Sequence, residues 1–171
     1  MRNSDRGKRT IAYLVERGRL ETITVEDTAA AAETLVGRAA RRLETTAVAA
    51  FGGGDIDGAY VAAYDAYRMA AEALLAWQGM RATGGDGSHM TVEDAVSAQF
   101  AADIPAFAKP TFERFRRTRH SAQYFDPDAA PITEADAKWG LEKAAAALAG
   151  VKQLLATPPA GQKASRLAGP A

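Results

Sequence analysis

YVAAYDAYRMAAEAL, residues 60–74, places an apolar or aromatic side chain at every third or fourth position. Steps of four and three keep such side chains on one face of an α-helix, where they can be buried together. The positions that follow this step are Tyr60, Tyr64, Tyr67, Ala71 and Leu74. Asp55 or Asp57 is expected to cap the helix, because a carboxylate accepts hydrogen bonds from the free N–H groups of a first turn. We expect this helix to run to about Ala82.

The same periodicity is found on both sides of this segment. One periodic stretch begins at Thr24 and reaches Ala50, and another begins at Thr133 and reaches Ala156. Each of the two threonines is followed three residues later by an aspartate, in the arrangement of a capping box. Two helices of more than about 20 residues would each be about 30 Å long. With short connections between them, such helices favour an antiparallel bundle.

Shorter helices are expected elsewhere, over about 5–20 with a break near Gly18, over 91–102 and over 111–124. Alanine is abundant and runs of β-branched residues are rare, so helix is expected throughout the chain. The predicted fold class is all-α. It is an antiparallel up-and-down helical bundle of four to five main helices with a short extra N-terminal helix.

A length of 171 residues favours one domain with a single core. Within it, residues 1–23 form a basic N-terminal helical extension, and residues 24–156 form the bundle. Residues 157–171 are rich in Pro, Gly, Ala, Gln, Lys and Ser, a composition that predicts a disordered tail.

Composition excludes several classes of function. The chain has no cysteine, which excludes disulfides, thiolate metal sites and cysteine nucleophiles, and its two histidines make a metal centre unexpected. The formal net charge is zero, so binding to nucleic acid must rest on a local basic patch. No stretch approaches the about 18 uncharged apolar residues that span a bilayer, and no signal peptide is visible. We therefore expect no membrane association and a cytoplasmic location.

Residues 109–124 supply such a patch, with five Lys or Arg side chains and one acid. Residues three and four apart are neighbours on a helix, so Arg116, Arg119, His120 and Gln123 form one polar stripe. Arginine offers a fork of donors to phosphate oxygens, and histidine can transfer a proton near neutral pH. RNA carries its own nucleophile, the 2′-OH. Its cleavage therefore needs only a base, an acid and charge stabilisation, without a metal.

Simpler interpretations apply to the same side chains. Arginines on an exposed helix are usually a solvated face, and His120 would then be an exposed polar residue. His89 lies in a glycine-rich segment and can be a loop residue without a role. Tyr60, Tyr64 and Tyr67 are expected in the core or in a dimer interface, and less so as a platform on which bases stack.

Three blocks of sequence follow one another in a specific order. They are AYDAYRMAAEALL with QGMRAT (63–75 and 78–83), GGDGSH (84–89) and RRTRHSAQY (116–124). A helix that opens with ITEADA (132–137) comes after them. In order and spacing these blocks resemble the HEPN family (higher eukaryotes and prokaryotes nucleotide-binding), over roughly residues 55–155.

The resemblance implies an up-and-down bundle and a homodimer in which the third block of each subunit lines a shared cleft. Many HEPN proteins are metal-independent ribonucleases, often toxins paired with a nucleotidyltransferase-fold antitoxin, and others are non-catalytic RNA-binding or assembly modules. The family motif has an arginine, then a polar residue, and a histidine a few residues later. Arg119 and His120 match the first two positions, whereas Tyr124 stands at the histidine position. With an ordinary pKa of about 10, tyrosine is a poor base at neutral pH, although it can donate a proton.

Three hypotheses follow. The first is a HEPN-type endoribonuclease without cofactor, the toxin of a toxin–antitoxin or defence pair. In it, Arg119 would stabilise charge, His120 would move the proton and Tyr124 would orient or donate. The phosphate-binding residues would be Arg116, Arg117 and Gln123. The second is a non-catalytic HEPN module that binds RNA, nucleotide or a partner protein through the same cleft, and the third is a purely structural dimer.

Overall fold

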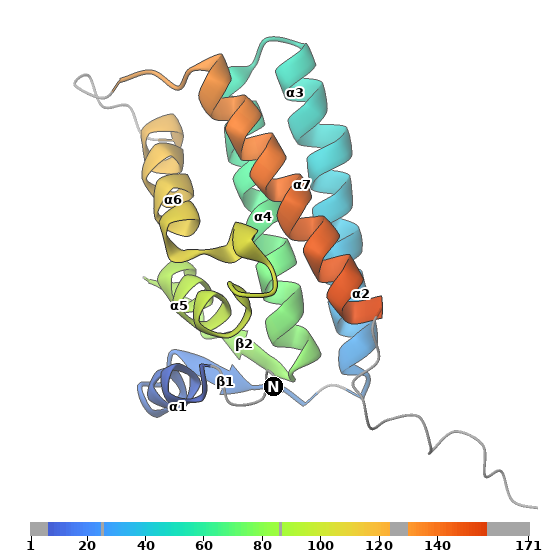
Figure 1. Cartoon of the computed structure of the whole chain (residues 1–171), viewed down its shortest axis with the longest axis vertical. Helices are drawn as coiled ribbons and strands as arrows, with labels where there is room; N and C mark the ends of the chain where they lie inside the picture. The colour runs from blue at the N-terminus through green and yellow to red at the C-terminus, as the bar shows by residue number, and fades with distance from the viewer. Residues whose placement is uncertain (1–6, 25, 86, 124–129, 157–171) are drawn as a thin grey trace, which may run out of the picture.

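The computed structural model describes residues 7–24, 26–85, 87–123 and 130–156, with residues 120–123 described by their backbone alone. The long helix α4 (Ile56–Trp77) runs through the middle of the molecule, and α2, α6 and α7 lie alongside it (Figure 1). Helix α5 and a small two-stranded ribbon cover one end of α4. The predicted all-α bundle is confirmed.

The other helices differ in length. The longer ones are α2 (Thr28–Arg41), α5 (Ser88–Phe100), α6 (Lys109–Gln123) and α7 (Glu134–Ala156), and the shorter ones are α1 (Lys8–Glu16) and α3 (Val48–Gly52). A π-helical segment, Arg42–Ala47, joins α2 to α3. The helix predicted over 24–50 is therefore one continuous rod that begins at Thr28 and reaches Gly52.

Helix α4 is the core of the bundle because small and aromatic side chains on most of its sides are buried. Asp55 is its N-cap, and a carboxylate oxygen of Asp55 accepts a hydrogen bond from the backbone N of Gly58 at 2.9 Å. The helix ends at Trp77, so the prediction that it reaches Ala82 was wrong. Gly79 has φ 71°, a left-handed conformation that glycine adopts without strain, and the chain turns there.

A two-stranded antiparallel ribbon replaces the last predicted turn of that helix. Strands β1 (Leu20–Thr22) and β2 (Met80–Ala82) pair in the register Leu20↔Ala82. No strand was predicted here, and the ribbon joins the N-terminal extension to the end of α4. Leu14 of α1 and Leu20 of β1 are each 1% exposed and belong to the same hydrophobic core as the bundle.

Two helix starts also differ from their prediction. The N-cap of α2 is Asp27 and not Thr24, because the Asp27 carboxylate accepts hydrogen bonds from two backbone N–H groups, both at 3.0 Å. Helix α5 starts at Ser88, earlier than predicted. The capping box before α7 is confirmed. The backbone N of Asp136 donates to Thr133 Oγ1, and the backbone N of Thr133 donates to Asp136 Oδ2, each at 3.1 Å.

An aromatic cluster fixes α6 against α4. Phe112 and Phe115 of α6 are buried, and their rings lie 4.8 and 4.6 Å from the ring of Tyr67. Tyr60 and Tyr64 are buried beside Phe115, so the tyrosine stripe of α4 lies in the core and not on a surface.

Among the described residues, no helix is both long and apolar enough to cross a membrane.

Candidate functional site

The orientation of α6 about its own axis places three of its arginines in one surface hollow. Because Phe112 and Phe115 face the core, the polar side of α6 is turned toward the start of α5 and the middle of α4. The result is an open hollow of about 380 Å³, here named the arginine hollow. Its lining residues are Tyr64, His89, Arg116, Arg117 and Arg119.

His89 lies in the first turn of α5, directly after Gly87 and Ser88. Gly87 is the N-cap of this helix and has φ 86°, a conformation that favours glycine, so the glycine-rich segment sets where α5 begins. Nδ1 of His89 is hydrogen-bonded to Oη of Tyr64 at 2.7 Å. A tyrosine hydroxyl can donate or accept, so the same bond serves both neutral tautomers of the imidazole.

Arg119 is held by the same tyrosine. Its guanidinium carbon lies 5.1 Å from the centre of the Tyr64 ring, within the range of a cation–π contact. Nε of Arg119 is buried and makes no hydrogen bond to any described residue. A buried donor without a partner favours an anionic ligand that can accept from it.

Arg116 is anchored from the α5 side. Its Nε lies 3.5 Å from a carboxylate oxygen of Glu93, whose side chain is only 5% exposed. Burial raises the pKa of the Glu93 carboxyl, while the charge of Arg116 acts in the opposite direction. The pair fixes the stem of Arg116, and the side chain remains 41% exposed toward the hollow.

Burial and the charges of the hollow favour the neutral form of His89. Burial lowers the pKa of His89 below 6.5, and the charges of Arg68, Arg119 and Arg116 lower it further. Burial raises the pKa of the Tyr64 hydroxyl to about 12, so it stays protonated. A neutral imidazole next to arginines can take a proton while the arginines hold an anion.

Several predicted site residues are brought together, and others lie outside the description. Arg116, Arg117 and Arg119 line one hollow. The side chains of His120 and Gln123 lie outside the described part of α6, and Tyr124 lies outside the described residues. His89 was not predicted as a site residue. The one sequence signal that could have found it is the second HEPN-like block, which ends at His89.

The lowered pKa of His89 predicts a pH dependence of stability. As the pH falls below about 6.5, the unfolded chain binds a proton at this histidine before the folded chain does, which favours unfolding. His89 should therefore add stability at pH 7.5 relative to pH 5, so the loss of stability in His89→Gln relative to wild type should be greater at pH 7.5 than at pH 5. Urea unfolding of both proteins at the two pH values measures it. Equal pH dependence of the two would show that folding does not shift this pKa.

No cluster of three or more His, Asp or Glu side chains in the described ranges has a geometry that could hold a metal ion. Comparison of the chain with family models, with curated proteins and with solved structures finds no match.

Proposed function

We propose that this protein is a HEPN-type endoribonuclease that binds and cleaves RNA at the arginine hollow without a metal ion. The observation that carries the proposal is the meeting of Arg116, Arg117 and Arg119 with His89 in one open hollow, where burial lowers the pKa of the histidine. Three guanidinium groups fit the phosphates of a polyanion, and a neutral imidazole fits the removal of a proton from the 2′-OH. As expected for HEPN toxins, a nucleotidyltransferase-fold antitoxin would be the partner protein.

The proposed reaction uses the side chains of the arginine hollow, His120 and the RNA itself. His89 takes the proton of the 2′-OH, the 2′-oxygen forms a bond to phosphorus, and the bond from phosphorus to the 5′-oxygen breaks. Arg119 stabilises the extra negative charge of the five-coordinate phosphorus, and Arg116 and Arg117 hold the adjacent phosphates. His120, to which the sequence analysis gave proton transfer, supplies the proton of the leaving 5′-oxygen. The products are a 2′,3′-cyclic phosphate and a 5′-hydroxyl.

The alternative is a non-catalytic HEPN module that binds RNA, nucleotide or a partner protein at the same hollow. The observation in its favour is Tyr124, which stands where the family motif has a histidine. A homodimer is proposed in both cases, and two arginine hollows would then share one cleft. Because Tyr60, Tyr64 and Tyr67 are in the core, the dimer proposal rests on the resemblance alone.

The test uses an oligodeoxynucleotide with a single ribonucleotide, incubated with purified full-length protein in EDTA. Cleavage at the ribonucleotide, with a 2′,3′-cyclic phosphate end, is expected, and the 2′-O-methyl version of the same oligonucleotide should stay intact. Fluorescence anisotropy measures binding of both oligonucleotides, and light scattering of the same sample should give a dimer. Binding without cleavage, by a protein shown to be folded, would support the non-catalytic module. If the folded protein neither binds nor cleaves this substrate or total cellular RNA, both the ribonuclease and the non-catalytic RNA-binding module are rejected.

A further inference from the structure

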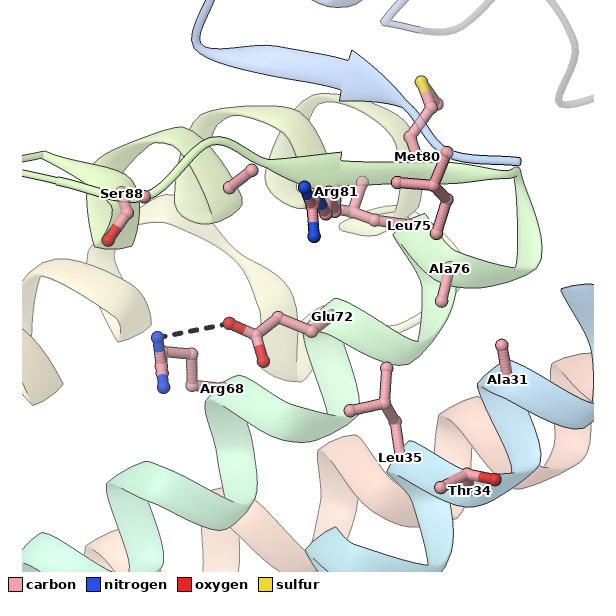
Figure 2. A pocket seen from close by; sticks show the side chains of 13 residues that line it. Ala31, Thr34, Leu35, Arg68, Glu72, Leu75, Ala76, Met80, Arg81 and Ser88 are labelled. Atoms are coloured by element: carbon pink, nitrogen blue, oxygen red, sulfur yellow. Dashed lines mark ion pairs between the residues drawn. The ribbon is translucent and has the colours of Figure 1, made fainter. Parts of the chain in front are cut away.

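A second and larger hollow lies between α2, α4 and the β1–β2 ribbon. Its volume is about 520 Å³, within the range of small-molecule sites in proteins. We name it the ribbon pocket. Figure 2 shows Leu35 of α2 and the α4 side chains facing it from below, with Met80 and Arg81 of β2 on the opposite side. The arginine hollow is separate, although Ser88 lines the one and His89 the other.

One end of the ribbon pocket is polar. Arg68 and Glu72, one turn apart on α4, form an ion pair at 3.1 Å, and Ser88 lies at the same end (Figure 2). Nε of Arg68 is buried and has no hydrogen-bond partner among the described residues. The Arg68 side chain is 28% exposed, so a ligand can reach it from the pocket. A guanidinium that is partly exposed to the pocket still has N–H donors beyond the one paired with Glu72, and such an arginine is suited to a carboxylate that accepts from them.

The charge of the lining favours an anion. Among the lining residues that the structure describes, Arg68 and Arg81 are the cations and Glu72 is the carboxylate. Burial raises the pKa of the Glu72 carboxyl, which disfavours its negative charge. Arg81 is also paired with Glu21 across the ribbon at 2.6 Å, so it is fixed in place at the pocket wall.

The other end of the ribbon pocket is apolar and aliphatic. Ile23, Leu35, Leu75 and Met80 supply side chains, and the alanines of α2 and α4 leave the space open, as Figure 2 shows for Ala31 and Ala76. None of the described lining residues is aromatic. Thr34 lies here too, but its hydroxyl already donates to the carbonyl of Ala30, so it does not need a hydrogen bond from a ligand. A flexible alkyl chain fits such a lining better than a ring system, which gains from aromatic partners.

We infer that the ribbon pocket binds a small aliphatic carboxylate, with its head group on Arg68 and its alkyl chain against Leu35, Leu75 and Met80. The inference does not depend on the proposed ribonuclease activity, because none of these four side chains lines the arginine hollow. Arg68 acts as the donor to the carboxylate, and the alkyl chain displaces water from the apolar end.

Decanoate is the probe, and decanamide and decylammonium are its neutral and cationic counterparts. Isothermal calorimetry with the full chain, below the concentration at which the probes form micelles, measures affinity and stoichiometry. We expect one decanoate per chain, bound about tenfold or more tightly than either counterpart, because each lacks the charged hydrogen bond to Arg68. Absence of decanoate binding, or equal affinity for the three probes, would overturn the inference.

Two variants separate the apolar end from the polar end. Ala31→Trp places a large side chain in the pocket and should weaken decanoate binding about tenfold or more, whereas Ala30→Trp, on the exposed side of the same helix, should not. Arg68→Gln should remove the preference for decanoate over decanamide, while Arg38→Gln on exposed α2 surface should keep it. Thermal unfolding first shows that each variant is folded. Equal decanoate affinity in Ala31→Trp and Ala30→Trp, or an unchanged preference in Arg68→Gln, would each contradict the proposed site.

Discussion

Replacing Arg119 by alanine is expected to lower the rate of RNA cleavage by about 100- to 1,000-fold, the usual effect of removing one donor that stabilises charge in a transition state. Arg119 is placed for this role by its contact with Tyr64, which orients the guanidinium next to His89. Binding of the intact RNA should fall much less, because Arg116 and Arg117 still hold the neighbouring phosphates. The cleavage rate at saturating RNA, measured with the single-ribonucleotide substrate, reports the first effect, and anisotropy reports the second.

Arg114→Ala is the matched control for this experiment. Arg114 lies on the same helix, but its guanidinium is 4.0 Å from the ring centre of Trp139 and its Nη2 is 3.1 Å from Asp136. It therefore faces α7 and should not affect cleavage more than a few fold. Arg119→Lys should lose most of the rate, because a lysine keeps the charge without the planar fork. Similar rates for Arg119→Ala and Arg114→Ala would remove Arg119 from the mechanism.

Replacing Phe115 by alanine is expected to lower the free energy of unfolding by about 3–5 kcal/mol. The Phe115 ring is fully buried, and ring centres of Tyr67 and Trp139 lie 4.6 and 4.8 Å away. A side chain added at Gly140 of α7 would come within 3.4 Å of the Phe115 ring, so α7 packs closely on it. Truncation leaves a cavity that these neighbours cannot fill, and the loss is a large part of the stability of a typical domain.

Urea unfolding measures this change, with two companion variants. Phe115→Leu should cost about 1–2 kcal/mol, because it fills part of the cavity. Tyr13→Ala removes a ring that is 51% exposed and covered on one side by Arg17, and it should cost about 1 kcal/mol or less. A loss in Phe115→Ala no greater than in Tyr13→Ala would show that the ring is not part of the packed core.

The helices could be predicted from sequence because periodicity and capping are local. Tyr60, Tyr64 and Tyr67 follow one face of α4, and the capping box at Thr133 begins α7 where it was expected. The β1–β2 ribbon could not be predicted in this way. Each of its strands has only three residues, and Glu21 and Arg81, which pair across it, are 60 positions apart in sequence. Strand pairing at that distance leaves no pattern in either segment alone.

The candidate site was predictable only in part, for a similar reason. The arginines of α6 share one helix, so their stripe is visible in the sequence. His89 belongs to α5, and its hydrogen-bond partner Tyr64 is 25 positions earlier on α4. Only the packing of α5 and α6 against α4 brings the His89 imidazole and Arg119 to the same tyrosine. The ribbon pocket likewise arises where small side chains of α2 and α4 meet β2, and no single segment shows it.

The separation of the two strands has a consequence for the order of folding. The antiparallel ribbon closes a loop that contains α2, α3 and α4, and the entropy of closing so long a loop is lost before the few strand hydrogen bonds form. We therefore expect the helices around α4 to assemble first, and β1 to dock last and to leave first. Amide protons of β1 should then exchange with solvent through a partial opening that spares α4. Such an opening would also release β2, whose Met80 and Arg81 line the ribbon pocket, and would loosen that wall for a ligand without unfolding of the bundle.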